Sequence, residues 1–135
     1  MGLWSTRTVN TNTPGNLRLV VRENQPVPSG FGPDYDFLNF GEIEACNSNA
    51  SGRLAFVTMH NDFTRALWIE QADGSLVPVV KEFTMVDVSG NGSDQRLLMS
   101  FEVIQGYSST GDGRSTFFND NGHVVMRLMF ADGSE

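Results

Sequence analysis

The sequence has one cysteine, one lysine and two histidines in 135 residues, and each scarcity excludes a class of protein. With Cys46 alone, the chain forms no internal disulfide and offers no cysteine cluster for a metal. Lys81 is the only lysine, the net charge is −7, and the arginines are scattered along the chain. Without a basic patch for a phosphate backbone, we expect a protein that binds no nucleic acid.

Long apolar runs are also missing. No window approaches the roughly 18 apolar residues of a membrane-spanning helix, so we expect no membrane association. The first twenty residues lack the basic start and apolar stretch of a signal peptide, which leads us to expect a cytoplasmic chain. No stretch shows a sustained helical period.

What the sequence does contain is typical of an all-β protein. Hydrophobic residues make up 39% of the chain, ten of them phenylalanine, which is enough for a packed core. The 14 glycines recur beside Asn, Asp and Ser, the residues that form tight turns. We expect a single all-β domain over residues 1–135.

The chain contains an internal repeat. "LRLVVRENQPV" (17–27) matches "LVPVVKEFTMV" (76–86) at an offset of 59, and "NASGRLAF" (49–56) matches "NDNGHVVM" (119–126) at an offset of 70. The offset grows because the second copy carries an insertion in a loop rich in Gly, Ser and Asp.

The Leu-Trp pair at the start of the chain matches the Leu-Trp of "ALWIEQ". Counted from the repeat, its place lies just past the C-terminus, so the second copy is permuted and takes its last strand from the N-terminus. Repeat one covers about 17–75, and repeat two covers about 76–135 and is completed by a strand at 2–7.

Each repeat supplies four predicted strands, and the turn signals "NDNG" and "ADGS" favour tight connections. Pro78 indicates an edge strand or the start of a strand, because proline cannot donate a ladder hydrogen bond. The predicted strands are 2–7, 17–23, 37–46, 53–60, 66–71, 76–82, 97–104 and 123–130.

Four antiparallel strands per repeat are typical of a β-propeller blade. Two blades do not close a ring, so we predict a homo-oligomer, with three chains and six blades favoured over four chains and eight. The alternative is a monomeric β-sandwich of two four-stranded sheets.

"NASGRLAF" fills every position of an N-x-x-G-x-x-A-F motif, and the chain here resembles the bacterial tandem-repeat proteins named for it. The second copy, "NDNGHVVM", keeps the asparagine and glycine but replaces Ala-Phe with Val-Met. The resemblance implies propeller-like repeats with no assigned activity. The residues that we interpret as structural are Asn49, Gly52, Asn119 and Gly122, together with Trp4 and Trp68.

Candidate ligand-binding residues gather in two loops, 24–36 and 105–116. Loops at strand ends commonly carry binding sites, and aromatic rings there can stack on a sugar or a peptide. Acidic turns can hold calcium, but no EF-hand spacing is present, so we interpret them as solvated turns. The expected ligand contacts are Phe31, Asp34, Tyr35, Asp36, Tyr107 and Asp112, with Phe37 and Phe63 as further aromatic residues near loops.

No constellation of catalytic or metal-binding residues emerges. His60 and His123 share no ligand spacing and are expected on the surface, Cys46 is expected in the core, and no nucleophile elbow occurs. We therefore predict no catalytic residue, metal or cofactor. The expected function is a non-enzymatic binding module for a carbohydrate or protein partner. The alternative is a purely structural self-assembling repeat, and a hydrolase is less favoured.

Overall fold

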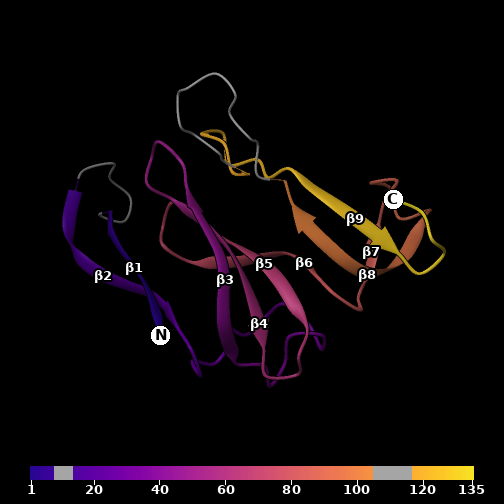
Figure 1. Cartoon of the computed structure of the whole chain (residues 1–135), viewed down its shortest axis with the longest axis horizontal. Coiled ribbons are helices and arrows are strands. Elements are labelled where there is room, and N and C mark those ends of the chain that lie inside the picture. Colours follow the sequence, from indigo (N-terminus) through magenta and orange to yellow (C-terminus); the bar gives the residue numbers. More distant parts are fainter. Residues whose placement is uncertain (8–13, 105–116) are drawn as a thin grey trace.

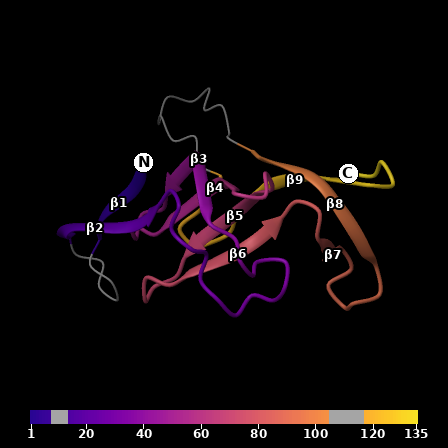
Figure 2. The same ribbon diagram turned by 90° about the horizontal axis from the view of Figure 1, so that it is seen from below.

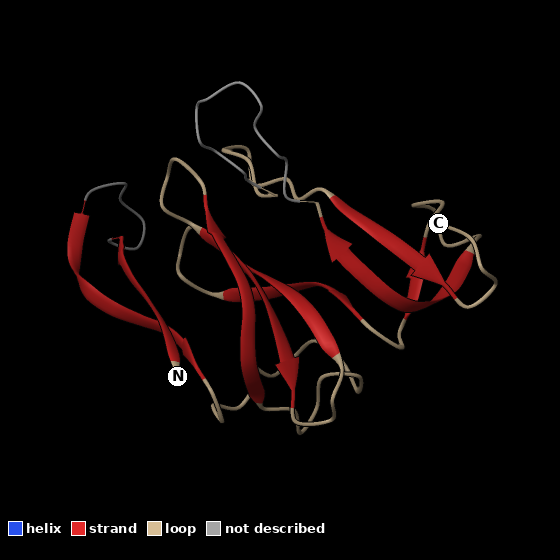
Figure 3. Cartoon of the chain, viewed as in Figure 1, coloured by secondary structure: helices blue, strands red, loops and turns tan. Residues whose placement is uncertain are grey.

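The computed structural model describes residues 1–7, 14–104 and 117–135, and the regular elements there are all β-strands (Figure 3). The predicted all-β class is confirmed. The strands are β1 (Gly2–Arg7), β2 (Pro14–Arg22), β3 (Phe40–Ser48), β4 (Leu54–His60), β5 (Arg65–Glu70), β6 (Leu76–Lys81), β7 (Met85–Asp87), β8 (Gln95–Val103) and β9 (Met126–Phe130).

The predicted ranges coincide with the observed strands except at β7. Apolar residues bounded by turn residues mark the other strands, and the boundaries differ by only a few residues. β7 is missed because three residues are too few to show an alternating pattern.

The strands form three antiparallel sheets. β3-β4-β5-β6 is the central sheet, β1-β2 is the N-terminal hairpin, and β7-β8-β9 is the C-terminal sheet. Pro78 lies in β6, which is an edge strand of the central sheet as predicted, and its missing N–H therefore interrupts no inner ladder.

The central sheet is covered on both faces, because successive residues of its inner strands point to opposite sides. Phe56 belongs to a buried cluster shared with Val21 of the hairpin. Val57, the next residue, belongs to a second cluster shared with Leu98 of the C-terminal sheet. Figures 1 and 2 show the hairpin and the C-terminal sheet on opposite sides of the central sheet.

This layering differs from the sandwich considered as an alternative. A sandwich of two four-stranded sheets has one core between them. Among the described strands only one sheet has four strands, and each of its faces has its own hydrophobic cluster and its own smaller sheet.

A buried ionic contact fastens the hairpin to the central sheet. The Glu70 side chain at the end of β5 is fully buried and forms ion pairs with Arg7 of β1 and Arg18 of β2. Arg7 also donates hydrogen bonds to the carbonyl oxygens of Gln71 and Ala72, at 3.1 and 3.3 Å. Because breaking a buried pair leaves an unpaired charge, these contacts fix the position of the hairpin.

Strands that the repeat relates show the same irregularity in backbone pairing. In the hairpin, the register shifts between Leu3 and Trp4 of β1. In the central sheet, it shifts between Leu67 and Trp68 of β5. The bulge thus falls within the same Leu-Trp pair, and β1-β2 corresponds to β5-β6.

The two N-x-x-G stretches form the same turn. Gly52 and Gly122 donate to the carbonyl oxygens of Asn49 and Asn119, at 2.9 and 3.0 Å, and both glycines have positive φ, 73° and 83°. Each asparagine side-chain oxygen accepts the N–H four residues on. Asn49 Nδ2 also donates to the Asn119 carbonyl oxygen at 3.4 Å, so the two turns lie against each other.

The predicted addition of β1 to β9 is not seen within the described part of one chain. β9 pairs with β8 and β1 pairs with β2, and no described ladder joins β9 to β1. Figure 1 shows β1 and β9 on opposite sides of the central sheet.

Candidate binding surface

The aromatic residues of the loop 24–36 hold it against the central sheet. Phe31 and Tyr35 are half-buried and meet the Trp68 ring edge-on, with centroid distances of 5.8 and 5.7 Å. Burial, reinforced by the charge of Asp34, raises the pKa of Tyr35 to about 12. Asp34 and Asp36 are exposed. The rings therefore serve the core, while the carboxylates face solvent.

The expected surface position of His60 is wrong. His60 is 2% exposed at the end of β4, and its Nε2 accepts a hydrogen bond from Trp68 Nε1 at 3.3 Å. Burial lowers the pKa of His60 to about 4, with the Lys81 charge acting in the same direction. The Phe40 ring lies 6.0 Å away, a contact that the linear sequence does not show. His123 is exposed, as expected.

Cys46 also differs from its expected position. It is exposed on β3, an edge strand whose burial alternates along its length, and the cysteine falls on the more exposed side. Tyr107 and Asp112, the candidates of the second loop, lie outside the described residues.

Three exposed phenylalanines lie at one end of the central sheet, and we call them the phenylalanine surface. Phe37 precedes β3, Phe63 lies between β4 and β5, and Phe83 follows β6, with exposed fractions of 98, 82 and 53%. Because the strands are antiparallel, the start of β3, the β4–β5 turn and the end of β6 meet at the same end of the sheet.

The backbone of each of these phenylalanines is left-handed, with φ of 65°, 63° and 62° at Phe37, Phe63 and Phe83. Bulky residues are outliers in this region, and such a conformation costs on the order of 1–3 kcal/mol. The chain therefore holds three apolar rings in solvent on backbone that disfavours them.

The backbone turn that carries Phe63 occurs five times among the described residues, which shows what the turn itself requires. Each copy closes with a hydrogen bond from the first N–H to the fifth carbonyl oxygen, at 2.8–3.1 Å. The fourth position is glycine in the other four copies, Gly52, Gly74, Gly122 and Gly133, with φ of 73–86°. The five turns span Asn49–Arg53, His60–Thr64, Gln71–Ser75, Asn119–His123 and Phe130–Ser134.

Contacts on two sides hold the Phe63 turn in place. The Asn39 N–H donates to the Asn61 side-chain oxygen at 2.8 Å, and the Asn61 N–H donates to the Asn39 carbonyl oxygen at 3.2 Å. On the other side, Lys81 Nζ forms an ion pair with Asp62 at 3.4 Å. The turn is thereby tied to the two neighbouring segments of the phenylalanine surface.

Phe37 and Phe63 are among the aromatic loop residues that the sequence predicts, and Phe83 is not. A comparison of the repeated stretches shows that phenylalanine is unusual at positions 63 and 83. "NDFT" stands where two other turns read "ADGS", and "VVKEF" stands where the first copy reads "VVREN". Asn24 and Phe83 share a positive φ, which asparagine tolerates better than phenylalanine.

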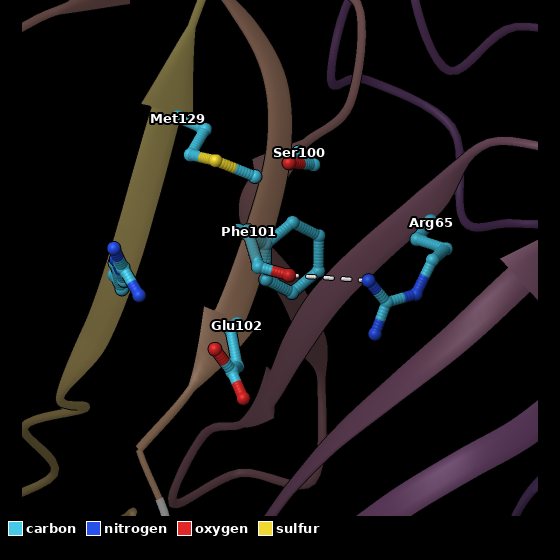
Figure 4. A pocket seen from close by; sticks show the side chains of 6 residues that line it. Arg65, Ser100, Phe101, Glu102 and Met129 are labelled. Carbon is cyan, nitrogen blue, oxygen red and sulfur yellow. Dashed lines mark hydrogen bonds between the residues drawn. The ribbon is translucent and has the colours of Figure 1, made fainter. Parts of the chain in front are cut away.

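A hollow of about 410 Å³ is lined by residues of the central and C-terminal sheets (Figure 4). The Arg65 guanidinium lies 5.1 Å from the Phe101 ring centroid and donates to the Phe101 carbonyl oxygen at 3.1 Å. Arg65 also bonds Glu44, and Arg127 pairs with Glu135. Both guanidinium groups of the hollow are thus engaged within the chain. The lining residues are Arg65, Ser100, Phe101, Glu102, Arg127 and Met129.

Two searches of the described residues bear on metals and membranes. No group of three or more His, Cys, Asp or Glu side chains there is arranged to hold a metal ion. That part of the chain also includes no helix long and apolar enough to cross a membrane.

Comparison with known proteins identifies a family but no activity. Searches of curated proteins and of solved structures found no match. A family model matches residues 1–135. Because the match spans the sequence from end to end, the chain belongs to DUF7453, a family of unknown function.

Proposed function

We propose that this chain is a non-enzymatic binding module that presents the phenylalanine surface to a carbohydrate or protein partner. The observation that carries this proposal is the combination of exposure and strain. An exposed ring on left-handed backbone adds little to folding, and strained backbone clusters at functional positions. Exposed apolar patches mark interaction sites, and aromatic residues are enriched among the residues that dominate binding energy.

We also propose that the repeats are blades of a β-propeller shared between copies, with a trimer favoured. The central sheet supports this, because it has four antiparallel strands and a neighbouring sheet on each face. A ring would repeat the phenylalanine surface and make weak contacts multivalent. Light scattering should give three times the 14.9 kDa chain mass, and a monomer at every concentration contradicts the shared ring.

A glycan array tests the binding function. The labelled chain is compared with the double variant Phe37→Ser/Phe63→Gly and with the control Val88→Ser, which changes an exposed apolar residue outside the phenylalanine surface. We expect a class of glycans that binds the native chain and the control but not the double variant.

Other outcomes separate the alternatives. Glycan binding that survives in the double variant contradicts the role of the phenylalanine surface. A blank array with a stable oligomer favours the second candidate, a structural repeat whose role is assembly alone.

A further inference from the structure

Among the described strands, two sheet edges lack the neighbour that their counterparts have. In the central sheet, β4 pairs with β5. β9, the counterpart of β4, and β1, the counterpart of β5, each have one neighbour among the described strands. A free edge presents unpaired N–H and C=O groups to any strand that fits.

We propose that β9 of one copy pairs antiparallel with β1 of a second copy, which extends the C-terminal sheet to the order β7-β8-β9-β1-β2; its last four strands match β3-β4-β5-β6 of the central sheet. This inference rests on the shared ring proposed above and specifies which strands form its contact. The partner is a second copy of this chain, because the chain itself carries the counterparts of both strands.

The counterpart relation is supported on both sides of the proposed contact. β4 and β9 follow the same N-x-x-G turn and end in the same five-residue turn. β5 and β1 share the Leu-Trp pair and the bulge inside it. The free strands β9 and β1 therefore carry the same features as the paired strands β4 and β5.

The central sheet also predicts the register of the contact. Phe56 lies opposite Trp68 in the β4–β5 ladder. An offset of 70 takes Phe56 to Met126, and the shared Leu-Trp pair takes Trp68 to Trp4. Met126 of one copy should therefore lie opposite Trp4 of the next.

Exposed apolar side chains are present on both edges. On β9, Val125 and Met129 are exposed, and on β1, Trp4 is 53% exposed although its counterpart Trp68 is fully buried. In the predicted register Trp4 lies beside Met126 on one face of the sheet, whereas Val125 and Met129 point to the other face. Burial of apolar surface is favourable at about 25 cal/mol per Å², so the contact removes an unfavourable exposure.

The two edges lie on opposite sides of the central sheet (Figure 1), so the two proposed contacts of one copy are made through different parts of its surface. A contact between two different surfaces repeats from copy to copy until the ring closes or a filament grows. The shared ring is the closed form of this contact.

Cysteine cross-linking between separately purified variants tests the register. In a Cys46→Ser background, Val125→Cys is mixed with Ser5→Cys. Their counterparts in the central sheet, Ala55 and Ile69 respectively, lie opposite each other. Mild oxidation should give a disulfide-linked dimer. The control mixture of Ser5→Cys with Arg127→Cys, two residues out of register, should give much less, because a disulfide tolerates little deviation.

A second pair of variants reports on assembly itself. Trp4→Ser should shift the mass from oligomer to monomer without altering the monomer fold, because Trp4 is exposed in the single chain. Leu17→Ser, an exposed apolar change on β2, is the control that should keep the oligomer.

Each outcome bears on one proposal. The in-register dimer together with loss of the oligomer in Trp4→Ser supports β9–β1 pairing. An oligomer without this cross-link, or dimers from either cysteine variant alone, overturns the β9–β1 contact and leaves a shared ring standing. A native chain that is monomeric at all concentrations overturns both.

Discussion

The strands β5 and β1 carry the same Leu-Trp pair and the same bulge, yet their tryptophans lie in opposite environments. Trp68 is fully buried, with its ring 5.1 Å from that of Phe40, whereas Trp4 is 53% exposed. Each strand has a neighbour on one side, β6 or β2. Two things differ: β5 has β4 on its other side, which β1 lacks within the described chain, and the Phe31 and Tyr35 rings pack against Trp68. Burial of the tryptophan thus depends on the neighbouring strand and on the loop that covers it.

Substitution of the two tryptophans should give the largest difference in stability. Trp68→Ala should lower the free energy of unfolding by about 3–5 kcal/mol, since it opens a cavity among the surrounding rings. Trp4→Ala in the monomer should change it by no more than about 0.5 kcal/mol. Urea denaturation at low protein concentration measures both, and similar losses would contradict the difference in burial.

β4 ends in His60, whereas its counterpart β9 ends in Phe130. The pKa of His60 is about 4 in the folded chain and about 6.5 in the unfolded chain, so the unfolded state binds more protons between these values. The free energy of unfolding should be unaffected by His60 above pH 6.5 and should fall by roughly 3 kcal/mol as the pH is lowered to 4.

His60→Gln, which keeps an acceptor for Trp68 Nε1, isolates this contribution. Both proteins lose stability through their carboxylates at low pH, so the difference between their curves belongs to His60. Denaturation from pH 7 to pH 4 measures it. Parallel curves would show that His60 is not held neutral.

The two N-x-x-G turns should respond unequally to loss of the asparagine. Asn49 is buried, bonds its own turn and donates to the other turn, whereas Asn119 is exposed. Asn49→Ala should cost about 1–2 kcal/mol, and Asn119→Ala about half of that, because an unmade hydrogen bond costs more in a buried site. Thermal unfolding of the two variants measures the difference, and a larger loss for Asn119→Ala would reverse the comparison.

The smallest expected effect is a gain in stability. Phe63→Gly should raise the free energy of unfolding by about 0.5–1 kcal/mol, because it places there the residue that the other four described copies of the turn contain. Gly133→Ala, at a φ of 81° with open space around it, should lower it by a similar amount, about 1 kcal/mol. Denaturation measures both changes. If Phe63→Gly lowers the free energy of unfolding, the Phe63 ring makes a stabilising contact and its role is structural.

The strands and turns could be predicted because their signals are local. Turn residues bound each apolar run, and "NDNG" and "ADGS" specify positive φ within a few residues. The candidate site was predicted less well. Phe31 and Tyr35 were selected as aromatic loop residues, but only the folded loop shows that they contact Trp68. Burial of His60 likewise depends on a segment twenty residues away in sequence, through Phe40.

The sequence by itself determined the all-β class and the strand ranges, since these depend on side-chain alternation and turn chemistry, and it predicts a correspondence between the two halves. The tertiary structure decided which faces are buried, because alternation marks two sides of a strand without saying what covers each. It also decided that β1 and β9 lie on opposite sides of the central sheet, because Glu70, Arg7 and Arg18 fasten the hairpin there. The strained backbone of the phenylalanine surface is visible only in the folded turns.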